Sequence, residues 1–161
     1  SRGAMLAGKY FRDTGRKTPA YVGGLFDKRK RVGFALGLGL PQPEILFDNG
    51  GSTLQDGFNS FERIIREEPA TDCVLCANDI LAIGFIKAAT SRGYKVPDDI
   101  AVIGFDDIRL AKYFSPALTT VKLHMEEIGE KSIGLLKKIM NDDKSVSRES
   151  VDCELIVRDS A

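Results

Sequence analysis

The alternation of strand-like and helix-like segments constrains the fold of this chain more than any other feature. Short apolar runs typical of strands occur at "AYV", "EILFD", "CVLC", "AVIGF", "LTTV" and "CELIV". Most of them are separated by segments with apolar residues at helical spacing, such as residues 54–68. This alternation predicts an α/β fold, a parallel sheet with helices on both faces.

Length and composition narrow the class of protein. The chain has 161 residues, enough for one domain with a proper core. Lys and Arg together number 23, as do Asp and Glu, so no net charge draws the chain to nucleic acid or to an anionic membrane. No apolar run approaches the roughly 20 residues of a membrane span, and none has the layout of a secretory signal. We therefore expect a cytoplasmic protein without a membrane partner.

The three cysteines predict neither a disulfide framework nor a metal site. Their odd number favours a reducing compartment. Cys73 and Cys76 have the spacing of a redox pair, but both fall in a predicted buried strand, where side chains at i and i+3 point to opposite faces. A zinc site would need a second pair, and only Cys153 remains. We expect no metal and no cofactor, and interpret the pair as small buried strand residues.

Polar dipeptides follow two of the predicted strands directly. Asn78-Asp79 comes after "CVLCA", and Asp106-Asp107 comes after "AVIGF". In open α/β sheets, ligands bind in the crevice beyond the carboxyl ends of the strands. These two strand ends are therefore the predicted binding site.

The two adjacent aspartates allow several interpretations. Neighbouring carboxylates in sequence tend to diverge, which argues against a catalytic acid–base pair. They could hold Mg²⁺ with a phosphate, although the chain has no P-loop. Asp107 is a candidate N-cap for a helical turn at "DIRLAKYF", and Asp79 is a candidate N-cap for the helix that follows it. Asp106 then remains free to accept hydrogen bonds from ligand hydroxyls or amines.

Catalysis by a histidine is not expected. The only histidine, His124, follows a strand-like segment and has no evident partner. We predict no catalytic residue in this chain.

The residues around these strand ends match a known pattern. The segment from "CVLCAND" through "GYKVPDDIAVIGFDD" and "PALTTVK", closing with "ELIVRDS", resembles the effector-binding domain of the LacI/GalR family of bacterial transcription regulators. The resemblance covers residues 70–161, and "GAMLAGKYF", "GRKTPAYVGG" and "RVGF" extend it to the start. It implies a periplasmic-binding-protein-like type I core, with a small sugar-like effector held between two lobes.

The resemblance also implies how the chain is divided. Residues 1–161 would be the C-terminal part of the effector-binding and dimerisation domain, without the DNA-binding headpiece and the first part of the core. Residues 16–122 and 151–161 would form the C-terminal lobe, while 1–15 and 123–150 would lie at or across the lobe junction. The helix at 126–140 would then expose an apolar face that belongs against the other lobe.

Residue roles follow from the same resemblance. Asn78 and Asp106 would contact the effector. The basic ligand contact falls on Lys30, with Arg29 beside it, and Ser52 stands where an aromatic residue is common. At a twofold interface of a homodimer we expect Ile83, Tyr113 and Phe114, the alternative for these being the internal core.

Three functions remain to be compared. The first is the sensing module of a LacI-type repressor, which would meet operator DNA only through its headpiece. The second is a periplasmic sugar-binding protein of an ABC transporter. The third is an enzyme that uses Asp106 and Asp107 with Mg²⁺.

Overall fold

A single six-stranded sheet forms the centre of the molecule. The computed structural model describes residues 2–24, 27–41, 45–49, 51–141 and 149–161. The strands lie in the order β2-β1-β3-β4-β5-β6. Their bounds are β1 Pro19–Gly23, β2 Leu46–Asn49, β3 Cys73–Cys76, β4 Ala101–Asp106, β5 Thr119–Leu123 and β6 Cys153–Ile156. The predicted α/β sheet is confirmed.

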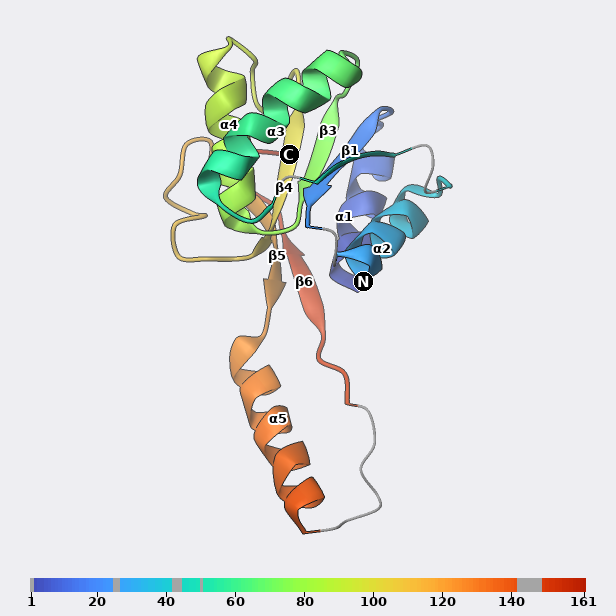
Figure 1. Ribbon diagram of the computed structural model, residues 1–161, viewed down its shortest axis with the longest axis vertical. Coiled ribbons are helices and arrows are strands. Elements are labelled where there is room, and N and C mark those ends of the chain that lie inside the picture. The colour runs from blue at the N-terminus through green and yellow to red at the C-terminus, as the bar shows by residue number, and fades with distance from the viewer. Residues whose placement is uncertain (1, 25–26, 42–44, 50, 142–148) are drawn as a thin grey trace.

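One strand departs from the predicted parallel arrangement. The first five strands pair in parallel, but β6 runs antiparallel to β5. The reason lies in the path of the chain: β5 leads out of the sheet to α5 (Met125–Met140), and β6 brings the chain back alongside it (Figure 1). A strand that retraces its neighbour has to run in the opposite direction.

Two pairs of helices cover the sheet. The pairs are α1 (Arg2–Asp13) with α2 (Lys28–Leu38), and α3 (Leu54–Glu67) with α4 (Asp79–Ser91). Adjacent residues of a strand point to opposite faces. In β4, Phe105 points toward Gly3 of α1, whereas Gly104 faces the side chain of Asp79 at the start of α4. The two pairs therefore lie on opposite faces of the sheet (Figure 1).

Each helix pair meets through glycines. A Cβ atom on Gly37 would overlap the carbonyl oxygen of Met5, and one on Gly84 would overlap that of Leu54. The glycines weaken the helical pattern of α2 in the sequence, since glycine costs about 1 kcal/mol in a helix. Here they let two helix backbones approach each other closely.

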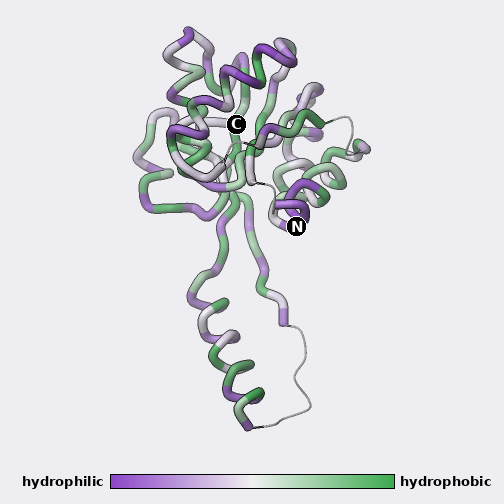
Figure 2. The backbone as a smooth tube through the Cα atoms, viewed as in Figure 1, coloured by the Kyte–Doolittle hydropathy of each residue, from purple (hydrophilic) through white to green (hydrophobic). Residues whose placement is uncertain are grey.

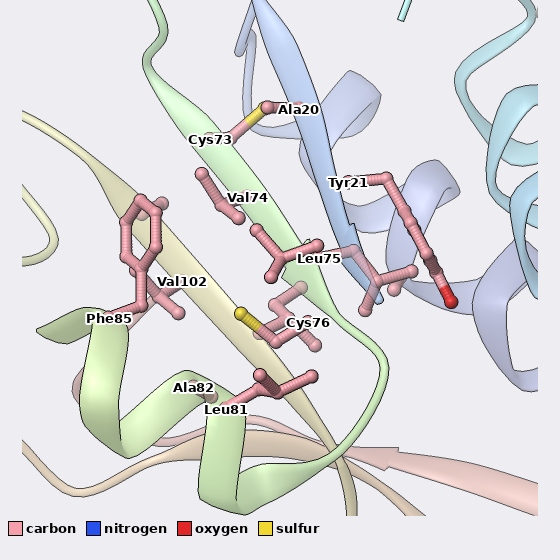
Figure 3. Packing of buried hydrophobic residues seen from close by; sticks show 14 of the residues in the cluster. Ala20, Tyr21, Cys73, Val74, Leu75, Cys76, Leu81, Ala82, Phe85 and Val102 are labelled. Carbon is pink, nitrogen blue, oxygen red and sulfur yellow. The ribbon is translucent and has the colours of Figure 1, made fainter. Parts of the chain in front are cut away.

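The cysteines of β3 belong to the core. Cys73 and Cys76 are both buried free thiols, and their sulfur atoms point to different sides of the strand (Figure 3). Burial raises the pKa of both thiols above its usual range. The interpretation as buried strand residues is confirmed.

Helix α5 stands apart from the rest of the fold. It extends beyond the sheet at the end of the β5–β6 pair (Figure 1), and none of its residues is buried. Apolar residues recur along the helix (Figure 2). Ile133, Leu136 and Ile139 follow one another at intervals of three residues, so they form an apolar stripe, and each is more than half exposed. The exposed apolar face that the sequence predicts is confirmed. The opposite end of the chain, α1, packs on the sheet and buries Ala4, Ala7 and Phe11.

Candidate functional site

The carboxyl ends of β1, β3 and β4 bring the predicted ligand residues to one edge of the sheet. Because these strands pair in parallel, Gly23, Cys76 and Asp106 end at the same side. Asn78 lies two residues beyond β3, and Asp106 is the last residue of β4. The edge therefore carries an amide and a carboxylate from two adjacent strands.

Asn78 is fixed by two hydrogen bonds. Its Oδ1 atom accepts from the backbone N–H of Leu81 at 2.8 Å, so Asn78 is the N-cap of α4. Its Nδ2 atom donates to the carbonyl oxygen of Ser52 at 3.3 Å. The predicted cap, Asp79, is instead the first residue inside the helix. Ser52 itself is exposed, and its backbone meets the N-terminal end of α3 through Asp56.

Of the basic residues, Lys30 turns toward this edge. Its Nζ atom donates a hydrogen bond of 2.7 Å to the carbonyl oxygen of Ala77 and lies 4.1 Å from the centre of the Phe105 ring. Arg29 is exposed on the surface of α2, and Arg31 packs over the ring of Phe47. The structure therefore brings Lys30, and not Arg29, next to the strand ends.

Asp106 is an exposed residue, and the charges of Lys30 and Asp27 act on its pKa in opposite directions. Burial raises the pKa of Asp106, the charge of Lys30 lowers it, and the charge of Asp27 raises it. Asp27 is held by the N–H of Gly24, which donates to its carboxylate at 2.9 Å. No hydrogen bond from the described residues reaches the carboxylate of Asp106, so its lone pairs are available to a ligand.

Asp107 does not cap a helix, and that prediction was wrong. Residues 109–113 form turns rather than a helix, and the Asp107 carboxylate accepts a hydrogen bond of 2.7 Å from Arg158 Nη2. Both side chains are 18% exposed. Because no helix follows Asp107, its carboxylate pairs with Arg158 and not with the backbone N–H groups of a helix N-terminus.

The sequence pattern did not predict the surroundings of Asp79. It is fully buried, and its Oδ2 atom accepts a hydrogen bond of 2.8 Å from the backbone N–H of Ile108. Its Oδ1 atom accepts from the hydroxyl of Thr120. Burial raises the pKa of Asp79 to about 6. Gly104 leaves the space for this carboxylate, since a Cβ atom there would overlap it, but the sequence alone does not show that overlap.

A hollow adjoins the edge where β5 passes into α5. Its volume is about 490 Å³, and residues 122–127 line it. Lys122, which lines the hollow, lies opposite Asp106 in the β4–β5 pairing. His124 lies in this lining, just before the helix, and its side chain makes no capping hydrogen bond.

The remaining predicted residues concern association rather than ligand contact. Tyr113 is 74% exposed, while Phe114 is half-buried and packs against the core. Ile83 is only 4% exposed in the single chain.

Two kinds of site have no counterpart in the described residues. No group of three or more His, Cys, Asp or Glu side chains there is arranged to hold a metal ion. Within the same ranges, no helix combines the length and apolar character that a membrane crossing requires.

Comparison with known proteins identifies the family. Residues 9–161 match the family model of the periplasmic binding protein-like domain. The chain is 34% identical to the HTH-type transcriptional repressor PurR of Mannheimia succiniciproducens, over 98% of this chain and 50% of that protein. It belongs to the LacI/GalR family of effector-binding domains. The resemblance inferred from the sequence motifs is confirmed.

Solved LacI-family structures share the fold. A LacI-family regulator from Enterococcus faecium with bound ribose superposes with a TM-score of 0.86 at 26% identity, over 99% of this chain and 62% of that one. A sugar-binding LacI-family regulator from Escherichia coli, complexed with phosphate, has a TM-score of 0.83 at 30% identity, over 99% and 60%. The chain spans about half the length of the curated relatives it matches.

Proposed function

We propose that this chain is the ligand-sensing and dimerisation part of a LacI-type repressor, and that it binds a small sugar-like effector at the carboxyl edge of the sheet. The observation that carries the proposal is the position of the Lys30 ammonium group. It donates a hydrogen bond to the carbonyl oxygen of Ala77, the residue before Asn78, and its charge lowers the pKa of Asp106. An ammonium group, an amide and an unpaired carboxylate together offer donors and acceptors for sugar hydroxyls.

The surroundings of Ser52 favour a hydroxyl-rich effector. Ser52 has a small, exposed hydroxyl side chain at the position where an aromatic residue would offer a flat surface for stacking. The E. faecium and E. coli regulators are described as ribose-bound and sugar-binding, respectively. PurR repressors are relatives as well, so a nucleobase belongs among the ligands to be tested.

The second lobe is the proposed partner of α5. Residues 16–122 and 151–161 would form one lobe, with 1–15 and 123–150 at or across the lobe junction. Residues 142–148 lie outside the described residues. The relatives are about twice as long as this chain, which leaves room for a second lobe and a DNA-binding headpiece. That lobe would cover the exposed apolar stripe of α5 and close the hollow over the effector.

Dimerisation is the second activity proposed for the chain. Tyr113 presents a large apolar ring to solvent, and Leu110 beside it is 49% exposed. We place the twofold interface there, next to Phe114, which packs against the core. Ile83 can add little contact area, since it is almost fully buried already.

The mechanism proposed is a shift between two arrangements of the lobes. An effector that binds one arrangement more tightly raises its population, and the change alters how the dimer presents its headpieces to operator DNA. The alternative function, a sugar-binding protein of a transporter, is disfavoured because the relatives are transcriptional repressors. For the same reason we propose binding without catalysis.

A thermal-shift screen of the full-length protein tests this proposal. The ligands are D-ribose, D-galactose, cellobiose, ribose 5-phosphate and hypoxanthine. We expect a sugar or sugar phosphate to raise the melting temperature, and Asp106→Ala to weaken its binding ten- to a hundredfold without unfolding the protein. This range corresponds to a charge-assisted hydrogen bond of about 1.5–3 kcal/mol.

The control is Arg16→Ala, at the opposite edge of the sheet, where the guanidinium donates to the carbonyl oxygen of Pro97 at 2.6 Å. It should leave the affinity unchanged. Equal affinities of Asp106→Ala and wild type would refute the site, and a shift with hypoxanthine alone would refute the sugar.

A further inference from the structure

The loop that ends β4 has an unusual backbone. Asp106 has φ of 109° and Asp107 has φ of 52°, and these are the two non-glycine residues with positive φ in the described ranges. Residues with side chains seldom adopt such angles, and they do so where surrounding contacts impose them. The direction of the Asp106 carboxylate therefore depends on whatever holds this loop.

Asp79 holds the loop from the side of α4. Its carboxylate accepts the backbone N–H of Ile108, two residues after Asp106, and the hydroxyl of Thr120 in β5. The Thr120 hydroxyl in turn accepts the N–H of Asp107 at 3.4 Å. One buried carboxylate thus joins the start of α4, the loop and the neighbouring strand.

Arg158 holds the loop from the side of the chain that follows β6. Its Nη2 atom pairs with Asp107 at 2.7 Å, and its Nη1 atom donates to the carbonyl oxygen of Leu118 at 2.7 Å. Its own N–H donates to the hydroxyl of Thr119 at 2.9 Å. The guanidinium therefore ties the loop to the start of β5.

We propose that Asp79 and Arg158 are positioning residues, which hold residues 106–108 in the conformation that presents the Asp106 carboxylate to the effector. The role in effector binding rests on the proposed function; the role in holding the loop does not. Neither residue touches the effector itself. Both act through Asp106, and both are hydrogen-bonded to β5 or to the residue just before it, so the loop is tied to the strand that leads to α5.

Burial supports this assignment. Asp79 is fully buried, and its pKa rises to about 6, mainly from burial and also from the charges of Asp106 and Asp107. Burying a carboxylate costs free energy unless it is hydrogen-bonded, and Asp79 accepts hydrogen bonds from Ile108 and Thr120. Gly104 leaves the space that it occupies.

Hydrogen exchange in the full-length protein without effector tests the positioning. Exchange of the amides in residues 106–118 should rise at least about tenfold in Asp79→Ala and in Arg158→Ala. Asp79→Asn should restore protection, since its amide oxygen can still accept from Ile108. Arg16→Ala, which removes hydrogen bonds from a guanidinium to the carbonyl oxygens of Asp72 and Pro97 at the opposite edge, should leave this segment unchanged.

A milder variant covers the case in which Asp79→Ala does not fold. Thr120→Val removes the hydroxyl that links Asp79 to Asp107 while keeping the shape of the side chain. We expect faster exchange of the Asp107 and Ile108 amides in this variant as well. Wild-type exchange of these amides in Arg158→Ala and Thr120→Val would overturn the proposal, whether or not any sugar binds.

The link to the effector is tested with D-ribose as the probe. Asp79→Ala should weaken binding at least about tenfold when Asp106 is present, and less than about twofold in the Asp106→Asn background. Its effect on melting temperature should be the same in both backgrounds. Equal losses of affinity in both would refute action through Asp106. If wild type does not bind D-ribose, that result counts against the proposed sugar, and the exchange data alone decide the positioning.

Discussion

The Nζ atom of Lys30 lies 2.7 Å from the carbonyl oxygen of Ala77, so a cation from α2 sits at the end of β3. The same charge lowers the pKa of Asp106 at the end of β4. A single ammonium group thus connects the two strand ends that carry the proposed ligand residues. It also covers the face of Phe105, which shields that ring from solvent.

Lys30→Met should raise the pKa of Asp106 and weaken effector binding about tenfold, because the variant lacks the charge that favours the ionised carboxylate. The carboxyl carbon signal of Asp106, followed by NMR through a pH titration, reports the pKa directly. Lys28→Met, in the exposed first turn of the same helix, is the matched control. An unchanged titration of Asp106 in Lys30→Met would contradict the electrostatic link.

The raised pKa of Asp79 predicts that the stability of the folded protein depends on pH. Its pKa in the folded protein is about 6, compared with 3.8 for an ordinary aspartate, so the folded state binds the proton more tightly than the unfolded state. Its contribution to the free energy of unfolding therefore falls as pH rises from about 4 to about 6, by up to about 3 kcal/mol.

The variant Asp79→Asn lacks this titration. The free energy of unfolding of wild type minus that of Asp79→Asn should decline between about pH 4 and pH 7. Urea denaturation at several pH values measures it. A difference that is constant over this range, or that grows with pH, would show that burial of Asp79 does not raise its pKa.

Gly84→Ala should destabilise the fold by about 1–3 kcal/mol, because the added methyl group meets the carbonyl oxygen of Leu54 and forces α3 and α4 apart. Lys87→Ala, on the exposed side of the same helix, should change stability by less than about 0.5 kcal/mol. Denaturant titrations of both variants provide the comparison. A more stable Gly84→Ala variant would mean that the helices can separate without cost.

Tyr113→Asp should convert the proposed dimer to a monomer, since a charge at the centre of an apolar contact loses its hydration on association. Light scattering over a range of concentrations gives the mass. Lys9→Asp, exposed on α1 at the other face of the sheet, should keep the mass of the parent protein. A dimeric Tyr113→Asp variant would remove this surface from the proposal.

The sequence was a good guide to the fold because its local patterns agree with the burial that the sheet imposes. Continuous apolar runs such as Val74–Cys76 become strands buried on both sides. The direction of β6 was not predictable from its own residues, because it depends on the path through α5. The spacing of apolar residues also cannot show whether Gly37 weakens its helix or allows close packing. That depends on the position of the partner helix α1.

The candidate site was predictable in outline and less so in detail. Polar residues after two apolar runs located Asn78 and Asp106 at the same edge of the sheet. The partners of Asp79 and Asp107 could not be predicted, since Thr120 and Arg158 lie 41 and 51 residues away in the chain. Interactions over such separations leave no local pattern.

Because α5 is attached to the rest of the fold only at the end of the β5–β6 pair within the described residues, a small change in its direction produces a large displacement at its far end. At 1.5 Å per residue its 16 residues extend about 24 Å. A tilt of the helix axis by about 10° at the end of the two-stranded ribbon would therefore move the far end of the helix by about 4 Å. Displacements of a few tenths of an ångström around Thr120, at the base of the ribbon, would be magnified into movements as large as a side chain.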